Sequence, residues 1–394
     1  MLTSLALIFV LGMALAWIFE KIKLPRLVGM LLIGIVLGPY VLNLFDPEIL
    51  LISGSLRELA LVVILIKAGL SLNLEDLKKV GRPAILMSFI PAVFEIIAVI
   101  LFAPRILGVT YGEAAIMGAV LGAVSPAVVV PKMVTLMDEK YGTNKSIPQL
   151  ILAASSLDDV FVIVLFTTFL GIENGTGISA WSFGQIPVSI LLGILIGILV
   201  GMLMALLFKK HHMRDSAKVV LVLGISFLLL ALENWVEGVV PISGLLAVMS
   251  MAIAMQAKHP DMAGRLAKKF GKLWIAAEVV LFVLVGAAVD IRYAKEAGLT
   301  VVILILVVLV FRSVGVVLCM LKTRLNRKER LYCVISYIPK ATVQAAIGAV
   351  PLSMGLPCGQ IVLTVAVVSI LITAPLGALL MDATYKKLLV HEEE

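Results

Sequence analysis

The sequence has few charged residues, few aromatic residues and almost no cysteine. Only 14% of its 394 residues are Asp, Glu, Lys or Arg, and 61% are apolar, whereas a typical soluble protein is about a quarter charged and about half apolar. This shortage of charge excludes an ordinary soluble enzyme. The three cysteines have no CxxC spacing and leave an odd number. They therefore indicate neither a disulfide framework nor a cysteine metal site.

Long apolar runs take the place of the missing charge. Each run is close to the roughly 20 residues that cross a bilayer as a helix. Reading them between polar breaks predicts thirteen transmembrane helices, at residues 2–19, 27–45, 55–73, 81–103, 112–136, 147–170, 183–208, 216–234, 238–256, 272–290, 297–321, 329–353 and 357–385. The sequence therefore predicts an all-α membrane protein.

The basic residues are distributed unevenly among the predicted loops. Of the 32 Lys and Arg residues, 25 lie in alternate loops and in the C-terminal tail. Because cytoplasmic loops carry the excess of basic residues, we expect the N-terminus outside and the C-terminus in the cytoplasm. The net charge of +7 is then explained by basic cytoplasmic loops that contact anionic lipid headgroups, and no nucleic-acid partner is expected.

Two segments resemble each other at an offset of 217 residues: VILIKAGLSLNLEDLKKVG from residue 63 and VLFVLVGAAVDIRYAKEAG from residue 280. The offset joins predicted helix 3 to predicted helix 10, so the two copies cross the membrane in opposite directions. Helices 1–6 and 8–13 then form two inverted six-helix repeats linked by helix 7, an arrangement typical of secondary transporters. The same offset pairs Glu95 with Arg312 and Ser125 with Thr342. We expect Glu95 and Arg312 to form a structural ion pair between the repeats.

Prolines interrupt two predicted helices at equivalent places in the repeats. A proline inside a helix removes one backbone hydrogen bond and leaves a carbonyl without its partner. Such irregular backbone is tolerated in a membrane only beside a cavity or protein packing. The predicted helix breaks are Pro126 and Pro131 in helix 5, next to Ser125, and Pro339 in helix 12, next to Lys340 and Thr342.

Two adjacent acids, Asp158 and Asp159, lie near the middle of predicted helix 6. Charges at this depth are costly and usually functional. Adjacent residues point about 100° apart on a helix, so the two carboxylates should have different roles. Ser155 and Ser156 precede them and offer hydroxyl oxygens.

Hard cations bind carboxylate, hydroxyl and carbonyl oxygens, and a proton neutralises the same carboxylate. The pattern therefore predicts a site where a monovalent cation and a proton compete. A pair between Lys340 and Asp158 is one way in which cation binding could loosen a lysine proton.

Three strings carry a resemblance to a known family: SSLDDV at 155–160, AVSPAVVVP at 123–131 and PKATVQAAIG at 339–348. They resemble monovalent cation:proton antiporters with paired aspartates, and look most like the bacterial NHA-type sodium/proton exchangers. The resemblance covers essentially the whole chain. It implies a homodimer in a bacterial inner membrane that exchanges Na⁺ or Li⁺ for H⁺ and needs no cofactor.

The resemblance also implies crossed discontinuous helices and a core that moves like an elevator against a scaffold. The scaffold would comprise residues 1–80 and 211–296, the core 81–182 and 297–394, and the linker helix 183–210. Asp158 and Asp159 would bind Na⁺ and carry protons. Better-known antiporters with paired aspartates have a lysine at the place of Arg312, so their two-proton stoichiometry is not carried over.

Three alternatives have different requirements. A potassium/proton antiporter shares the same core pattern, and the sequence does not distinguish Na⁺ from K⁺ as the transported cation. A sodium-coupled symporter for an organic solute would need a substrate cavity and has no use for two buried acids beside a lysine. An intramembrane aspartyl protease needs two aspartates on different helices, whereas Asp158 and Asp159 are adjacent on one. We therefore expect a transporter and not an enzyme.

Overall fold

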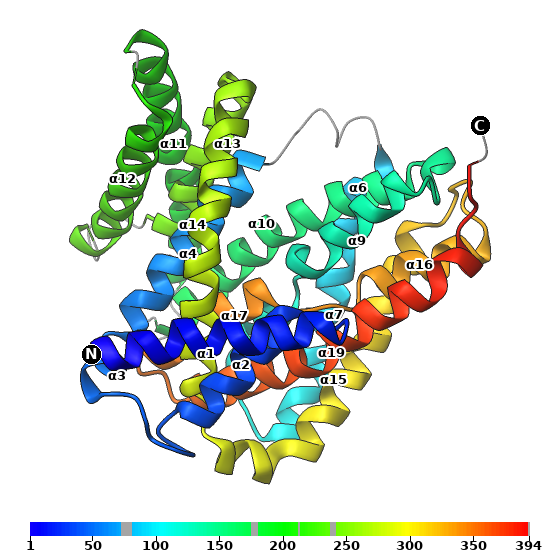
Figure 1. Ribbon diagram of the computed structural model, residues 1–394, viewed down its shortest axis with the longest axis horizontal. Helices are drawn as coiled ribbons and strands as arrows, with labels where there is room; N and C mark the ends of the chain where they lie inside the picture. The colour runs from blue at the N-terminus through cyan, green and yellow to red at the C-terminus, as the bar shows by residue number, and fades with distance from the viewer. Residues whose placement is uncertain (72–80, 175–179, 212, 237–241, 393–394) are drawn as a thin grey trace. The chain divides into compact units, whose positions relative to one another are not determined.

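The computed structural model describes residues 1–71, 81–174, 180–211, 213–236 and 242–392 (Figure 1). Within these ranges the regular elements are helices, apart from an isolated antiparallel bridge between Tyr141 and His391. The predicted all-α class is therefore confirmed.

The helices follow one another with short connections. In the first half of the chain they are α1 (Leu2–Lys21), α2 (Arg26–Leu37), α3 (Pro47–Leu51), α4 (Ser53–Ser71), α6 (Arg82–Met87), α7 (Ile90–Leu107), α8 (Tyr111–Leu121), α9 (Pro126–Asp138), the 3₁₀ turn η1 (Thr143–Lys145) and α10 (Ile147–Asn174). In the second half they are α11 (Ala180–Lys210), α12 (Asp215–Trp235), α13 (Gly244–Lys258), α14 (Pro260–Ala287), α15 (Ile291–Cys319), α16 (Arg327–Ser336), α17 (Thr342–Gly348), α18 (Val350–Ser353) and α19 (Gly359–Leu388).

Nine segments of the described chain are long and apolar enough to cross a membrane. The four other predicted spans also contain helices. Three of these, α2, α13 and the α17–α18 segment, are shorter apolar helices, and α4 carries three charged residues in its 19. A multi-pass membrane protein is thus supported, and the count of thirteen spans stays a prediction.

The chain divides into two compact units. Unit 1 comprises Met1–Arg57, Glu75–Val162 and Val279–Glu394, and unit 2 comprises Glu58–Leu74 and Ile163–Glu278. This division differs from the predicted scaffold and core, because the first two helices belong to the same unit as the predicted core helices. The scaffold and core assignment stays a prediction.

Unit 1 contains the helices that carry the predicted site. In it α15 packs along α7, α2 packs on α1, and α16 lies along α19 (Figure 1). The N-termini of two helices in unit 1 follow from the sequence. Thr110 and Glu113 form a capping box at the start of α8, and Asn326 and Glu329 form another at the start of α16. Each box satisfies backbone N–H groups that have no partner within the helix.

The packing of unit 2 depends on small residues. Gly193, Gly197 and Gly201 recur every four residues along α11, which lies beside α13 (Figure 1). A Cβ atom at Gly197 would lie 2.2 Å from the carbonyl oxygen of Ala247. Such contacts let helix backbones approach closely in a lipid environment, where apolar burial provides little driving force.

Candidate functional site

Two helices of unit 1 are interrupted, and their interruptions meet. The first gap separates the end of α8 at Leu121 from the start of α9 at Pro126, and the second separates the end of α16 at Ser336 from the start of α17 at Thr342. The backbone N–H of Ser125 donates a hydrogen bond to the carbonyl oxygen of Pro339 at 2.8 Å. This bond joins the two unwound segments directly, so the discontinuous helices predicted from the prolines are present.

The prolines differ in what they do. Pro126 is the first residue of α9, where a missing N–H costs nothing. Pro339 lies within the second gap. Pro131 was expected to break a helix, and this expectation is wrong, because α9 continues through it to Asp138. A single proline removes only one hydrogen bond of the helix, and the hydroxyl of Thr135 donates to the carbonyl of Pro131 at 3.1 Å.

Arg312 of α15 is the centre of a buried charge network. Its Nη1 lies 2.6 Å from Oε2 of Glu95 on α7, and its Nη2 lies 3.1 Å from Oδ2 of Asp158 on α10. The Nε group donates to the carbonyl of Tyr337 at 2.8 Å, and Nη1 also donates to the carbonyl of Gly122. The ion pair expected between Glu95 and Arg312 is present, and Arg312 additionally contacts both helix gaps.

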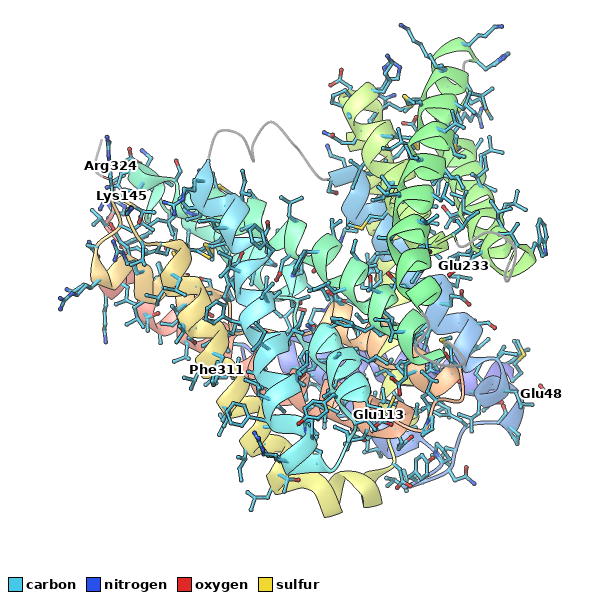
Figure 2. The ribbon with its side chains drawn as sticks, turned by 180° about the vertical axis from the view of Figure 1, so that it is seen from behind. Glu48, Glu113, Lys145, Glu233, Phe311 and Arg324 are labelled. Atoms are coloured by element: carbon cyan, nitrogen blue, oxygen red, sulfur yellow. The ribbon has the colours of Figure 1, made fainter. Side chains whose placement is uncertain are left out.

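Phe311, the residue before Arg312 on α15, makes a second contact between α15 and α7. Phe311 packs edge-on against Phe102 of α7, with ring centroids 5.6 Å apart (Figure 2). The aromatic side chain thus joins α15 to α7 through an apolar contact, and Arg312 joins the same two helices through Glu95.

Lys340 lies in the second gap and is almost completely buried. Its Nζ lies 2.7 Å from Oε1 of Glu95 and donates to the carbonyl of Leu121. The pair considered between Lys340 and Asp158 is not the one that forms, because Arg312 makes the contact with Asp158. The planar guanidinium of Arg312 has several N–H donors and contacts two carboxylates at once. Lys340 therefore pairs with Glu95 and not with Asp158.

The charges match the polarity of the helix ends. The carbonyls of Leu121 and Gly122, at the C-terminal end of α8, accept hydrogen bonds from Lys340 and Arg312. The N–H of Val124, just before α9, donates to Oδ2 of Asp158 at 2.8 Å. Cations therefore meet the negative end of one half-helix, and a carboxylate meets the positive end of the other.

Asp158 and Asp159 have different surroundings, as expected for adjacent residues of a helix. Asp158 is fully buried and is held through Oδ2 by Arg312 and Val124. Asp159 is 7% exposed. Within the described part of the chain, Oδ1 of each aspartate and the hydroxyl of Ser125 are buried without a hydrogen-bond partner. These three oxygens have capacity for a further ligand.

The remaining predicted residues are placed as follows. Thr342 is buried as the first residue of α17, and Ser155 donates to the carbonyl of Leu152 at 3.1 Å. The side chain of Ser156 lies outside the described part of the chain. The pairing of Ser125 with Thr342 agrees with the structure, since Ser125 directly precedes α9 and Thr342 begins α17.

Two residues that hold the gap segments in place were absent from the predicted site. Gln344 accepts a hydrogen bond from the N–H of Ala341 and donates to the carbonyl of Ala123, both at 2.7 Å. Thr373 of α19 accepts from the N–H of Lys340 at 3.0 Å. Gln344 lies within the string PKATVQAAIG and could have been found there, whereas Thr373 is one of several hydroxyl residues in a long apolar helix and carries no comparable signal.

Comparison with known proteins gives the same family as the motif strings. A family described as "Sodium/hydrogen exchanger, transmembrane" matches residues 6–383. Human sodium/hydrogen exchanger 9B2 is 36% identical over 388 residues, which cover 94% of this chain and 71% of that protein. The mouse protein of the same name is 34% identical, with 94% of this chain and 69% of that protein covered. Human sodium/hydrogen exchanger 9B1 is 33% identical, with 93% and 73% covered.

A solved structure supports the fold. The sodium proton antiporter MjNhaP1 from Methanocaldococcus jannaschii, at pH 8, matches with a TM-score of 0.85 over 98% of each chain and is 21% identical in sequence. This likeness concerns the fold, which is the antiporter fold that the resemblance of the three strings implies. Together with the match over residues 6–383, it confirms the resemblance drawn from the three strings, and the chain belongs to the transmembrane sodium/hydrogen exchanger family.

Proposed function

We propose that this protein exchanges Na⁺ or Li⁺ for H⁺ across a membrane, and that cation and proton compete at Asp158 and Asp159. The observation that carries the proposal is the pair of buried carboxylates beside two helix gaps. Asp158 is anchored by Arg312, and each aspartate keeps one buried oxygen without a hydrogen-bond partner in the described chain. The sodium/hydrogen exchanger names of the relatives support the same activity.

The charge balance of the centre favours a monovalent ligand. Glu95, Asp158 and Asp159 carry three negative charges when ionised, and two positive charges come from Arg312 and Lys340. The deficit of one positive charge can be filled by one monovalent cation or by one proton, but not by both. Competition for a single site, combined with alternating access to the two sides of the membrane, is sufficient for coupled exchange.

The arrangement supports a carrier and not an enzyme. Asp158 and Asp159 are neighbours on α10, so they cannot face each other across a substrate as the two acids of an aspartyl protease do. The cation and the proton are cargo, and the proposed cycle requires no cofactor. Movement of the core in the manner of an elevator is part of the proposal.

The finer placement of the protein is also proposed. The distribution of Lys and Arg favours an N-terminus outside and a C-terminus in the cytoplasm, and the resemblance to bacterial exchangers favours a bacterial inner membrane. A homodimer in contact with anionic lipids is the proposed assembly.

The exchange is tested in proteoliposomes that contain a pH-sensitive dye. We expect a sodium gradient to drive proton movement in the wild type and at least about 100-fold less in Asp159→Asn, because the amide cannot bind a proton reversibly or neutralise a cation. Asp138→Asn is the matched control, since Asp138 is an exposed acid at the end of α9, and it should transport normally.

Separate additions of Na⁺, Li⁺ and K⁺ distinguish the alternatives. Proton flux driven by K⁺ alone would identify a potassium/proton antiporter. The absence of flux with every cation, in correctly folded protein, would contradict exchange and favour a sodium-coupled symporter.

The competition itself predicts a pH dependence. As pH falls, protons should occupy the site, so the half-saturating Na⁺ concentration should rise toward tenfold per pH unit. The maximal rate at saturating Na⁺ should change less. Initial rates at several Na⁺ concentrations across pH 6 to 9 measure this, and a half-saturating concentration that is independent of pH would contradict a shared site.

A further inference from the structure

Unit 2 contains a cavity of about 550 Å³ that has no part in the proposed exchange. It lies where the C-terminal end of α11, the N-terminal end of α12 and the connection from α13 to α14 meet. We call it the basic pocket. Its charged lining residues are Lys209, Arg214, Asp215, Lys218, Asp261 and Arg265. Four are basic and two are acidic, which leaves an excess of two positive charges.

Asp215 is shared between two cations of the basic pocket. Arg265 Nε donates to its Oδ2 at 3.0 Å, and Lys218 Nζ lies 3.6 Å from its Oδ1. Lys218 is only 6% exposed, and its Nζ also lies 5.6 Å from the centroid of the Phe208 ring. A buried cation with half a counter-charge is electrostatically incomplete, and a bound anion would complete it.

His259 gives a second, independent indication of a ligand. It lines the basic pocket, and its Nε2 atom is buried with no hydrogen-bond partner in the described part of the chain. An imidazole nitrogen that carries a proton donates to an anionic oxygen. Basic groups and a further donor around one cavity fit the tetrahedral oxygens of a phosphate group.

We propose that the basic pocket binds a phosphate group, supplied by the headgroup of an anionic membrane lipid. The source is argued from the adjoining surface. Exposed apolar side chains lie within three residues of the pocket residues in sequence: Leu206 and Leu207 of α11, and Val220 and Leu221 of α12. They provide a surface for acyl chains next to the charged cavity. Basic pockets between transmembrane helices at the cytoplasmic side bind such headgroups.

The position of the basic pocket agrees with the proposed topology. Its residues belong to two of the loops richest in Lys and Arg, which are proposed to be cytoplasmic. Glu233 lies in the last turn of α12, at the end opposite the basic pocket (Figure 2). The inference thus names a lipid partner for the proposed exchanger. Binding is measured without transport, so a failure here would leave the exchange proposal intact.

The test measures thermal unfolding of the full chain in detergent with increasing mole fractions of phosphatidylglycerol or phosphatidylcholine. We expect phosphatidylglycerol to raise the unfolding temperature more. In Lys218→Gln/Arg265→Gln the half-maximal mole fraction should rise about fivefold for each cation removed. The control is Lys268→Gln/Lys272→Gln, which removes the same charge from exposed positions of α14 outside the basic pocket, and it should respond as the wild type does.

A variant with the opposite expected effect on lipid binding distinguishes the loss of the binding site from a folding defect. Asp215→Asn frees Lys218 and Arg265 from their shared carboxylate, so the half-maximal mole fraction should fall. An equal response of all variants to phosphatidylglycerol would overturn the proposal, as would an equal loss in the control pair.

Inorganic phosphate, added as its choline salt at matched ionic strength, separates the two sources. If phosphate alone gave the full effect with the same dependence on the variants, the lipid source would be wrong. If it gave little effect, the lipid source would be supported.

Discussion

The two helix gaps of unit 1 occupy equivalent places in the inverted repeats but differ in their contacts with side chains. The first gap supplies acceptors, because the carbonyls of Leu121, Gly122 and Ala123 all receive hydrogen bonds from side chains. The second supplies donors, through Lys340 within the gap and Gln344 just after it. The backbone roles are shared, because the N–H groups of Val124 and Ser125 in the first gap donate hydrogen bonds, and the carbonyls of Tyr337 and Pro339 in the second gap accept hydrogen bonds.

Glu95 and Arg312 follow the same division. They lie 217 residues apart in sequence, on α7 and α15, and form a buried ion pair across the two copies. An acid in the first repeat thus faces a base in the second. This complementarity explains how two copies of one fold can hold each other in a medium without water.

The largest expected effect comes from removing the donor that contacts both gaps. Arg312→Gln leaves Glu95 and Asp158 without their guanidinium partner, and loss of one member of a buried ion pair costs about 3–5 kcal/mol. Thermal unfolding in detergent measures the loss. Glu95→Gln/Arg312→Gln should lose less than the sum of the single variants, because Glu95 and Arg312 interact directly and the double variant removes both charges, although Lys340 and Asp158 each lose a partner. If the double variant kept wild-type stability but lost exchange, the structural role of the pair would be wrong.

An intermediate effect is expected at the residue that bridges the gaps by hydrogen bonds alone. Gln344→Leu leaves the carbonyl of Ala123 and the N–H of Ala341 without side-chain partners, and we expect a loss of about 2–3 kcal/mol in the free energy of unfolding. Gln344→Glu would place a buried carboxylate against the carbonyl oxygen of Ala123, so its loss should be at least as large. Equal stability of the leucine variant and the wild type would show that Gln344 does not hold the gaps together.

The smallest expected effect concerns the support of the second gap by α19. Thr373→Val removes the acceptor of the Lys340 N–H while keeping the side-chain shape, at a cost of about 1 kcal/mol. Thr364→Val is the matched control, because Thr364 is buried in the same helix but donates only to the carbonyl of Gln360. A larger loss in the control than in Thr373→Val would contradict a specific role for α19 at this gap.

Much of the fold could be predicted because a membrane imposes simple local rules. Apolar runs marked the helices, and Pro126 and Pro339 marked the two gaps. The topology indicated by the alternation of Lys and Arg stays a prediction. Pro131 was misjudged, because the same residue type can lie inside a continuous helix when only one hydrogen bond is lost. The offset of 217 residues was the most informative signal, since it placed Glu95 opposite Arg312 before any contact was known.

The partners within the charged centre could not be assigned from the sequence. Asp158 was considered with Lys340, yet Arg312 takes that place and Lys340 turns to Glu95 and to the carbonyl of Leu121. Which cation meets which carboxylate depends on side-chain reach and on the direction of helix ends, and neither has a signature in the spacing of residues.

The amino-acid sequence alone determined that this protein is an all-α membrane protein with an inverted repeat, two interrupted helices and a buried pair of acids. The inverted repeat follows from the similarity of segments 217 residues apart. The other properties follow from local hydrophobicity, proline chemistry and charge count, each of which acts over a few turns of helix. Only the tertiary structure decided that the interrupted segments share a backbone hydrogen bond, that Arg312 joins them, and that Gln344 bridges them. These contacts join residues far apart in the chain, so their geometry exists only after the helices have packed.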